Sequence, residues 1–263
     1  MNRSIPLLVI AFALGASSVL AADTRVVLCF PGGPGSTTDA QPTVDRFLAQ
    51  LDKEMGWKSS KGKYFNSMAA CRTAYKDLAP TMVMVPLHVY LSVRAAWKLT
   101  PVAILQNKET SGQFHILTKN AACQNCLTGA TVSTGLQVSD RFLSKVAFDG
   151  KVAVGKSFTV KRTRSPMRAI KLVVKGKAIA VIVDDVVKRS LDGLPLAQGL
   201  RAIVTGPQLP GAVVATVGKA PRKLAAVLTG LCKADRVLCK EMRITRFGNV
   251  DPARLLALEK KLR

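Results

Sequence analysis

The sequence predicts an α/β fold of two lobes, each a mainly parallel sheet flanked by helices, with a ligand cleft between them. Three observations support this. Short apolar runs alternate with amphipathic stretches, Pro and Gly clusters follow several of the runs, and the same strand–helix–strand order occurs twice, ending at Pro86 and again at Asp184. Of the 263 residues, 48% are hydrophobic, which is enough to build a core for each lobe.

The first half of the chain opens with a buried strand and a turn-rich loop. Arg25–Phe30 is apolar, and Pro31–Gly35 after it is a cluster of turn-forming residues. Further alternation predicts a helix over Thr43–Met55, a strand between Trp57 and Phe65, a helix over Ser67–Leu78 and a strand over Thr81–Val85. Strands and helices in this order favour parallel pairing with right-handed crossovers.

The second half repeats the pattern after a polar crossing at 108–112. We expect strands at Pro101–Leu105, His115–Thr118, Ala130–Ser133, Phe158–Lys161, Ala178–Val183 and Leu200–Val204, a helix start at Gln137–Leu143, a helix from Ser165–Pro166, and closing helices at Pro221–Leu231 and Pro252–Leu262. Residues 23–108 with 205–263 would form lobe 1, and residues 109–204 lobe 2. A ligand in such sheets binds beyond the carboxyl ends of the strands.

The first 22 residues have the three parts of a secretory signal peptide. Arg3 gives a positive head, Ile5–Leu20 is almost wholly apolar, and Ala21–Ala22 supplies small residues for cleavage. The alternative is an uncleaved membrane anchor, for which the run is short, since a span needs about 20 apolar residues. The sequence therefore predicts a periplasmic protein, secreted by a cleavable signal peptide.

An even number of cysteines in an exported chain indicates disulfides. Cys123 with Cys126, and Cys232 with Cys239, can each close a short loop, which leaves Cys29 with Cys71 by elimination among 15 possible connectivities. Cys123 and Cys126 also have the spacing of a redox pair or of half a zinc site. A zinc site would need further cysteines or histidines at ligand spacing, so we expect no metal and no cofactor.

The chain is strongly basic, with 39 Lys and Arg against 16 Asp and Glu, a formal charge of +23. Such a balance favours anionic partners. Aromatic residues make up 5% of the chain, which is little for stacking on bases, so we expect no nucleic acid. An anionic lipid, a polyanionic envelope or a small anionic ligand fits better, and the alternative is a solvated basic surface with no specific partner.

Several motifs in order resemble the type 2 periplasmic solute-binding proteins, nearest to the phosphate, phosphite and phosphonate binders of ABC importers. They are Pro86–Tyr90 in the place of a P-x-x-Y passage, Thr100–Leu105, Leu127–Val132 in the place of L-x-G-x-x-V, Ser165–Pro166, and Lys175–Asp185. The resemblance runs from about Val26 to the last helix. It implies the two-lobed type 2 fold, closure on a small solute, and a partner ABC permease or membrane sensor. We expect a monomer.

The resemblance also implies ligand-binding positions. A Ser/Thr turn of the phosphonate binders is matched by Ser133 and Thr134, with Ser139 later, and the P-x-x-Y passage places Pro86, His88 and Tyr90 at the cleft wall. Asp184 would meet a positive group of the ligand or anchor the hinge; the alternative is that it caps the next helix. A ligand-binding histidine of the family is replaced by Arg164 and Ser165.

An anion site follows from the residues themselves. Ser165 is a helix N-cap, and the helix N-terminus that it opens favours negative charge. Arg164 precedes it and can add charged hydrogen bonds. From the opposite lobe, Gly33, Ser36 and Thr37 can supply backbone and hydroxyl donors. Both segments have a simpler interpretation, as an ordinary helix start and an ordinary turn.

The leading hypothesis is a periplasmic binding protein, not an enzyme, that traps a small anionic solute by hinge closure. The second is an envelope interaction or sensor protein with the same fold that has lost its solute. The third is a thiol-disulfide enzyme that uses Cys123 and Cys126. The sequence has no G-x-S-x-G, H-E-x-x-H or phosphate-loop motif, which disfavours hydrolytic chemistry.

Overall fold

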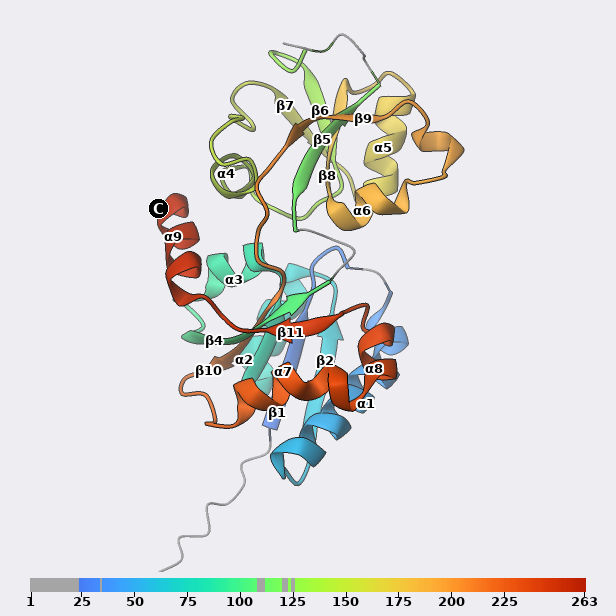
Figure 1. Ribbon diagram of the computed structural model, residues 1–263. Helices are drawn as coiled ribbons and strands as arrows, with labels where there is room; N and C mark the ends of the chain where they lie inside the picture. Colours follow the sequence, from blue (N-terminus) through green and yellow to red (C-terminus); the bar gives the residue numbers. More distant parts are fainter. Residues whose placement is uncertain (1–23, 34, 108–111, 120–122, 124–125) are drawn as a thin grey trace, which may run out of the picture.

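The computed structural model describes residues 24–33, 35–107, 112–119, 123 and 126–263. Within these residues the chain forms two α/β lobes stacked one above the other (Figure 1). The predicted fold class is confirmed. The predicted signal peptide, residues 1–22, lies outside the described residues. Among the described helices, none is both long and apolar enough to cross a membrane.

Lobe 1 is built on a six-stranded sheet in the order β11-β4-β10-β3-β1-β2. Its strands are β1 (Thr24–Cys29), β2 (Ser60–Phe65), β3 (Met82–Val85), β4 (Leu99–Gln106), β10 (Val213–Val217) and β11 (Arg246–Gly248). Its helices are α1 (Thr37–Met55), α2 (Met68–Leu78), α3 (Leu87–Val93), α7 (Leu224–Ala234), α8 (Arg236–Glu241) and α9 (Pro252–Leu262). Successive β1 side chains point to opposite faces: Val26 and Leu28 pack with α1 and α7, whereas Val27 and Cys29 pack with α2 and α3.

Lobe 2 is built on a five-stranded sheet in the order β7-β6-β8-β5-β9. Its strands are β5 (Phe114–Thr118), β6 (Thr131–Thr134), β7 (Thr159–Arg162), β8 (Ala180–Asp184) and β9 (Arg201–Thr205). Its helical segments are α4 (Asp140–Phe142), which continues as a π-helical turn at Leu143–Ala147, α5 (Pro166–Val174), α6 (Asp185–Ser190) and a 3-10 turn at Pro195–Ala197. Helix α5 covers one face of the sheet through Ala169, Ile170 and Val173, and the α4 segment covers the other.

Both sheets are mixed rather than purely parallel. β1 pairs in parallel with β2 and β3, and β6 pairs in parallel with β7 and β8. β10, a strand that the sequence analysis missed, lies antiparallel between β3 and β4, and β5 lies antiparallel between β8 and β9. The antiparallel pairing arises because β5 and β10 each enter their sheet directly from the other lobe, without a crossover helix.

Two segments connect the lobes and run side by side. The amide of Leu105 donates to the carbonyl of Ala212 at 2.7 Å, and the amide of Gly206 donates to the carbonyl of Phe114 at 2.9 Å. Glycine is required at Gly206, since a Cβ there would lie 1.8 Å from the carbonyl oxygen of Ala147. The crossings are therefore packed backbone against backbone.

The C-terminal helix α9 contacts both lobes, although the sequence analysis placed it in lobe 1. Glu259 forms an ion pair with Arg94 of lobe 1, and Lys261 forms one with Asp149 of lobe 2. Figure 1 shows this helix beside α3 and below α4. It thus spans the side of the junction between the lobes.

All three predicted disulfides are present: Cys29–Cys71, Cys123–Cys126 and Cys232–Cys239. Cys29–Cys71 joins the end of β1 to α2, and Cys232–Cys239 joins α7 to α8. The described residues contain no group of three or more His, Cys, Asp or Glu side chains that could hold a metal ion.

Candidate functional site

The carboxyl ends of the parallel strands in the two lobes face each other. The β1–α1 loop of lobe 1 approaches the β6–α4 loop of lobe 2 so closely that a Cβ on Gly32 would lie 3.4 Å from Cγ of Gln137. Beside it, the ring of His88 on α3 meets the ring of Phe142 on α4 edge-on, with centroids 5.8 Å apart. These two contacts bring the predicted ligand-binding segments of both lobes to one junction.

In lobe 2 the candidate site is formed by the turns after β6 and β7. The amide of Thr163 donates to the carbonyl of Thr134 at 2.8 Å, which holds the two turns together. Gly135 allows the start of α5 to pack on the β6 turn, because a Cβ on it would lie 2.2 Å from the backbone nitrogen of Pro166. Local packing thus fixes the position of Ser165 and of the residues around it.

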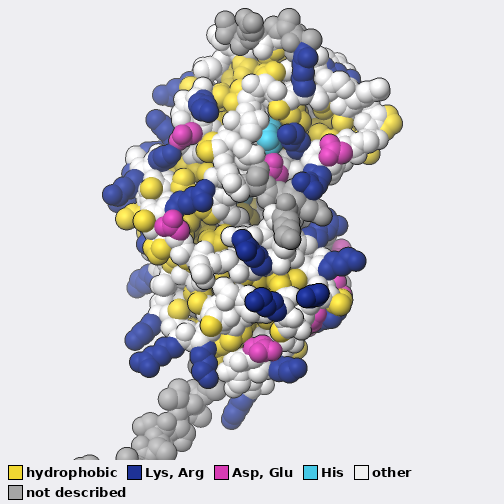
Figure 2. All heavy atoms as spheres, in the orientation of Figure 1, with side chains coloured by type: hydrophobic (Ala, Val, Ile, Leu, Met, Phe, Trp, Pro, Cys, Tyr) yellow, Lys and Arg dark blue, Asp and Glu magenta, His cyan; other side chains and the backbone are white. Residues whose placement is uncertain are grey.

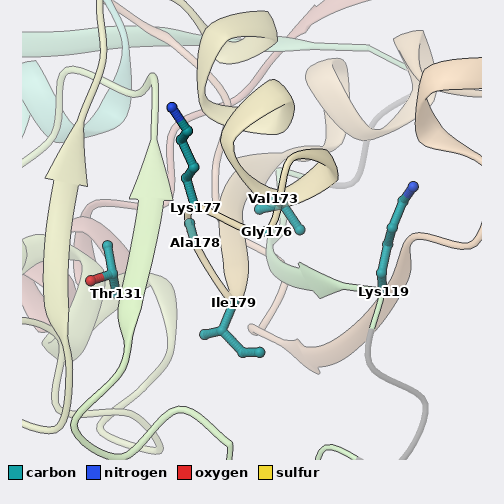
Figure 3. Close-up of a pocket in the computed structure, with 7 residues that line it drawn as sticks. All are labelled: Lys119, Thr131, Val173, Gly176, Lys177, Ala178 and Ile179. Atoms are coloured by element: carbon teal, nitrogen blue, oxygen red, sulfur yellow. The ribbon is translucent and has the colours of Figure 1, made fainter.

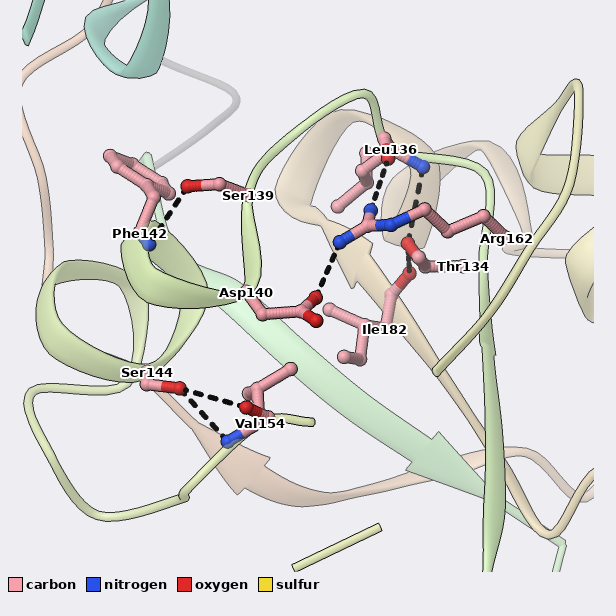
Figure 4. Close-up of polar contacts among 9 residues, drawn as sticks. All are labelled: Thr134, Leu136, Ser139, Asp140, Phe142, Ser144, Val154, Arg162 and Ile182. Carbon is pink, nitrogen blue, oxygen red and sulfur yellow. Dashed lines mark hydrogen bonds and ion pairs between the residues drawn. The ribbon is translucent and has the colours of Figure 1, made fainter. Parts of the chain in front are cut away.

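Ser165 caps α5, as predicted: its Oγ accepts from the amide of Arg168 at 3.4 Å. The first turn of α5 contains no acidic residue. Arg162 donates to the carbonyl of Leu136 at 3.3 Å and forms an ion pair with Asp140 (Figure 4). Arg164 is exposed, and its side chain forms no hydrogen bond or ion pair with the described residues.

A hollow of about 490 Å³ lies at this edge of lobe 2. It is lined by Gln137, Lys161, Arg162, Thr163, Arg164, Arg168, Lys171 and Leu172. Gln137, which reaches toward Gly32, forms part of its wall, so the hollow adjoins the junction between the lobes. Gln137 and Arg168 were missed by the sequence analysis; Arg168 stands four residues after Arg164, a spacing that could have signalled it.

A second hollow, of about 520 Å³, lies at the opposite edge of lobe 2 (Figure 3). It is lined by Lys119, Thr131, Val173, Gly176, Lys177, Ala178 and Ile179. Thr131 is the first residue of β6, so this hollow is at the amino end of the strand and away from lobe 1. No predicted site residue lies there.

The predicted serine and threonine ligands of the β6 turn form hydrogen bonds within lobe 2. Ser133 and Thr134 are fully buried, and their hydroxyls donate to backbone carbonyls, that of Ser133 to Ala169 and that of Thr134 to Ile182. Ser139 caps α4 by accepting from the amide of Phe142 (Figure 4). Ser133 and Thr134 are therefore committed to the fold of lobe 2, whereas Ser139 is exposed and its hydroxyl donates to no described residue.

The predicted donors of lobe 1 are also engaged. Ser36 and Asp39 form a capping box at the start of α1, and the hydrogen bonds from the backbone and side chain of Ser36 lower the pKa of the Asp39 carboxyl. Thr37 donates to the carbonyl of Tyr64 at 2.8 Å. The amide of Gly33 donates to the carbonyl of Phe30, and a Cβ on Gly33 would meet the Tyr64 hydroxyl at 2.4 Å. Ser36, Thr37 and Gly33 therefore form their hydrogen bonds within lobe 1.

Of the α3 residues, His88 faces the junction and Tyr90 does not. Pro86 precedes α3 as its N-cap residue. Tyr90 is fully buried; burial raises the pKa of its hydroxyl, and the nearby charge of Arg94 partly offsets this rise. Nε2 of His88 is buried without a hydrogen-bond partner among the described residues, and burial lowers the His88 pKa to about 4.

Asp184 and Asp185 have separate roles at the hinge. Asp184 caps α6 by accepting from the amide of Val187 at 2.9 Å, and burial raises its pKa. Asp185 lies 2.8 Å from Nε2 of the buried His115, whose Nδ1 lies 3.0 Å from the Thr205 hydroxyl. The alternative that Asp184 caps the next helix therefore describes its role in the structure. Asp185 instead anchors the hinge through His115, a histidine to which the sequence analysis gave no role.

Positive charge covers both lobes. Figure 2 shows Lys and Arg side chains over the whole visible face, with fewer acidic side chains among them. Part of this charge is neutralised in lobe 1, where Arg46 of α1 pairs with Asp235 and Glu241 near α8. At the lobe 2 hollow, the described residues show one such pair, Arg162 with Asp140.

Comparison with known proteins gives a fold and no close relative. No protein-family model and no curated protein matches the chain. Among solved structures, XAC2383 from Xanthomonas citri bound to chloride ion aligns with 17% identity and a TM-score of 0.69, covering 90% of this chain and 97% of that one. The same protein bound to ATP aligns with 14% identity and a TM-score of 0.68, covering 91% and 97%.

Two phosphonate-related structures are also similar. PhnD1 from Prochlorococcus marinus in complex with methylphosphonate has 14% identity and a TM-score of 0.63, covering 91% of this chain and 97% of that one. A binding protein component of an ABC phosphonate transporter from Pseudomonas aeruginosa has 12% identity and a TM-score of 0.63, covering 91% and 86%. The chain therefore has the same two-lobed α/β fold as these solved structures.

Proposed function

We propose that the protein is a periplasmic solute-binding protein of an ABC-type importer, which captures a small anionic solute between its lobes and is not an enzyme. The observation that carries this proposal is the unpaired Arg164 guanidinium at the serine-capped start of α5, on the edge of lobe 2 that faces lobe 1. Arginine can bind a phosphate or phosphonate group through two parallel hydrogen bonds. The similar structures support this class of solute, since they were solved with bound chloride, ATP and methylphosphonate.

In this proposal lobe 2 holds the solute and lobe 1 closes over it. Gln137 can donate an amide N–H beside Arg164, and the start of α5 contributes its positive dipole end. From lobe 1, His88 is neutral near pH 7 because its pKa is about 4, and a neutral imidazole carries one N–H donor. The network of His115, Asp185 and Thr205 ties β5, α6 and β9 together where the crossings enter lobe 2, and closure would be a rigid-body motion of the lobes.

The test is thermal unfolding of the disulfide-intact chain, residues 23–263, with phosphate, phosphite, methylphosphonate and sulfate. A solute at about 100 times its Kd adds roughly 2.7 kcal/mol to the free energy of unfolding. We expect one of these anions to raise Tm in the wild type and in Arg222→Ala, and to lose that effect in Arg164→Ala. Arg222 is an exposed lobe 1 arginine whose side chain has no partner among the described residues.

The alternative is an envelope interaction protein that keeps the fold without a solute. It is favoured by one observation, the internal use of the hydroxyls of Ser133, Thr134 and Thr37. It predicts no Tm shift with any anion, together with salt-sensitive sedimentation of the chain with vesicles of anionic lipid. A Tm shift that depends on Arg164 would exclude it.

A further inference from the structure

The lobe 2 hollow concentrates positive charge that the fold does not neutralise. Lys161, Arg164, Arg168 and Lys171 line it, all four are exposed, and none of their side chains forms a hydrogen bond or ion pair with the described residues. None of the residues that line it is acidic. This excess is much larger than one phosphonate group would need.

The sequence around the hollow has the same excess of basic over acidic residues. Between 151 and 177 the sequence contains no Asp or Glu, and its basic residues are Lys151, Lys156, Lys161, Arg162, Arg164, Arg168, Lys171, Lys175 and Lys177. Like charges three or four residues apart destabilise a helix by a few tenths of a kcal/mol per pair. A ligand with several negative charges would remove this repulsion at Arg168 and Lys171.

The arrangement of the cations fits an elongated ligand. Arg168 and Lys171 are three residues apart on α5, so they lie on one face of the helix with roughly 5–6 Å between their Cβ atoms. Arg164 lies before the helix, at the end that faces lobe 1. The row therefore leads from the junction between the lobes outward along α5.

The chemistry of the hollow narrows the class of ligand. Its lining contains no aromatic residue on which a nucleobase could stack. Guanidinium and ammonium groups in a row, with Gln137 as an amide donor, are suited to linked phosphate groups.

We propose that this hollow binds an oligophosphate, a chain of two or more linked phosphates, with one terminal phosphate at Arg164 and the following ones at Arg168 and Lys171. The proposal rests on the proposed function, because the phosphate at Arg164 occupies the place assigned there to the small anion. It extends that function by naming the solute as a multivalent phosphate chain.

The experiment is a calorimetric titration of the disulfide-intact chain with phosphate, pyrophosphate and tripolyphosphate at constant ionic strength. In the wild type, each added phosphate should lower Kd by roughly tenfold or more, since each gains a hydrogen bond to a charged group. The double variant Arg168→Ala/Lys171→Ala should reduce the ratio of the phosphate Kd to the tripolyphosphate Kd to near one. Lys175→Ala, at the C-cap of the same helix and outside the hollow, should keep the wild-type ratio.

The outcomes separate the two proposals. If phosphate binds through Arg164 but Kd does not change with chain length, the oligophosphate proposal is wrong and the proposed function stands. Equal loss of the length dependence in Lys175→Ala would also overturn it, because total charge rather than the hollow would then be responsible. Equally tight binding of a single-stranded oligonucleotide or of anionic vesicles would overturn it in favour of those polyanions. If none of the three phosphates binds, the oligophosphate proposal fails, and the proposed function is decided separately by the Tm shifts with phosphite, methylphosphonate and sulfate.

Discussion

Helices α1 and α5 both begin at a serine and follow a parallel strand, yet their third positions differ in charge. At α1 that position is Asp39, whose carboxylate accepts from the Ser36 amide at 3.0 Å and completes a capping box. At α5 it is Arg168, and the first turn has no acidic residue. The lobe 1 turn therefore satisfies its own helix dipole, whereas the lobe 2 turn remains positive and open to an external anion.

The two turns also differ in how they are held. Cys29–Cys71 ties the end of β1, just before the Ser36 turn, to α2. No described disulfide reaches the Ser165 turn, which is held by backbone contacts with Thr134 and Gly135. The Ser36 turn is therefore held by a disulfide and has its helix dipole compensated by Asp39, whereas the Ser165 turn has neither feature. This difference favours lobe 2 as the lobe that binds the anion and lobe 1 as the lobe that closes over it.

The largest expected effect comes from freeing the lobe 1 turn. Removing Cys29–Cys71 by Cys29→Ala/Cys71→Ala should lower the free energy of unfolding by about 4 kcal/mol, because the bridge closes a loop with a sequence separation of 42. Cys232→Ala/Cys239→Ala, with a separation of 7, should cost about 2 kcal/mol. Urea denaturation without reductant measures both. An equal or larger loss from the shorter loop would contradict the loop-length account.

The next effect concerns the junction, where His88 of lobe 1 meets Phe142. Its pKa is about 4 in the fold and 6.5 in its unperturbed state, so the unfolded chain takes up the proton first as pH falls. The free energy of unfolding should therefore decrease between pH 6.5 and 4, by about 3 kcal/mol at roughly 1.4 kcal/mol per pKa unit.

The variant His88→Leu should lack this part of the pH dependence. Denaturation midpoints of both proteins at pH 7, 5.5 and 4 give the comparison. Parallel pH curves for wild type and variant would show that His88 is not held neutral by burial.

A third prediction gives the lobe 2 turn the charge of the lobe 1 turn. Arg168→Asp should complete a capping box with Ser165 and stabilise α5 by about 0.5 kcal/mol. It should also weaken tripolyphosphate binding roughly 10- to 100-fold, because a hydrogen bond to a charged group is lost and a repulsive charge is gained. Melting curves and titration separate the two effects, and tighter binding in the variant would be inconsistent with a lobe 2 anion site.

The reciprocal change has the smallest effect. Asp39→Ala breaks the capping box of α1 and should cost about 1 kcal/mol of stability. Phosphate affinity should remain within about a factor of two, since the proposed phosphate site is at the lobe 2 turn and the changed residue lies in lobe 1. The same melting and titration experiments apply, and a large gain in affinity would show that the Ser36 turn is an anion site held closed by Asp39.

Local signals predicted most of the fold. Capping serines, glycine stops and apolar periodicity indicated α2, α5 and most strands to within a few residues. Helix α1 begins at Thr37 rather than at the predicted Thr43, because the capping box of Ser36 and Asp39 starts the helix despite Pro42 within it. The β10 strand was missed because its antiparallel insertion between β3 and β4 depends on a return crossing rather than on a local pattern.

The candidate site was predicted less well than the fold. Ser165 and Arg164 were predicted as site residues because a helix cap and a preceding cation are adjacent in sequence, and the structure confirms the cap. Ser133 and Thr134 were expected to bind ligand, but the sequence does not show that their hydroxyls satisfy carbonyls of neighbouring segments. The approach of Gln137 to Gly32 and the pairing of His115 with Asp185 join residues far apart in the chain, and no local spacing indicates them.

The most direct test is a crystal structure of the disulfide-intact chain, residues 23–263, grown with inorganic phosphate. The account predicts a phosphate within hydrogen-bond distance of the Arg164 guanidinium, at the Ser165 turn and between the lobes. A phosphate at the Ser36 turn instead, or none at Arg164 under saturating conditions, would contradict it.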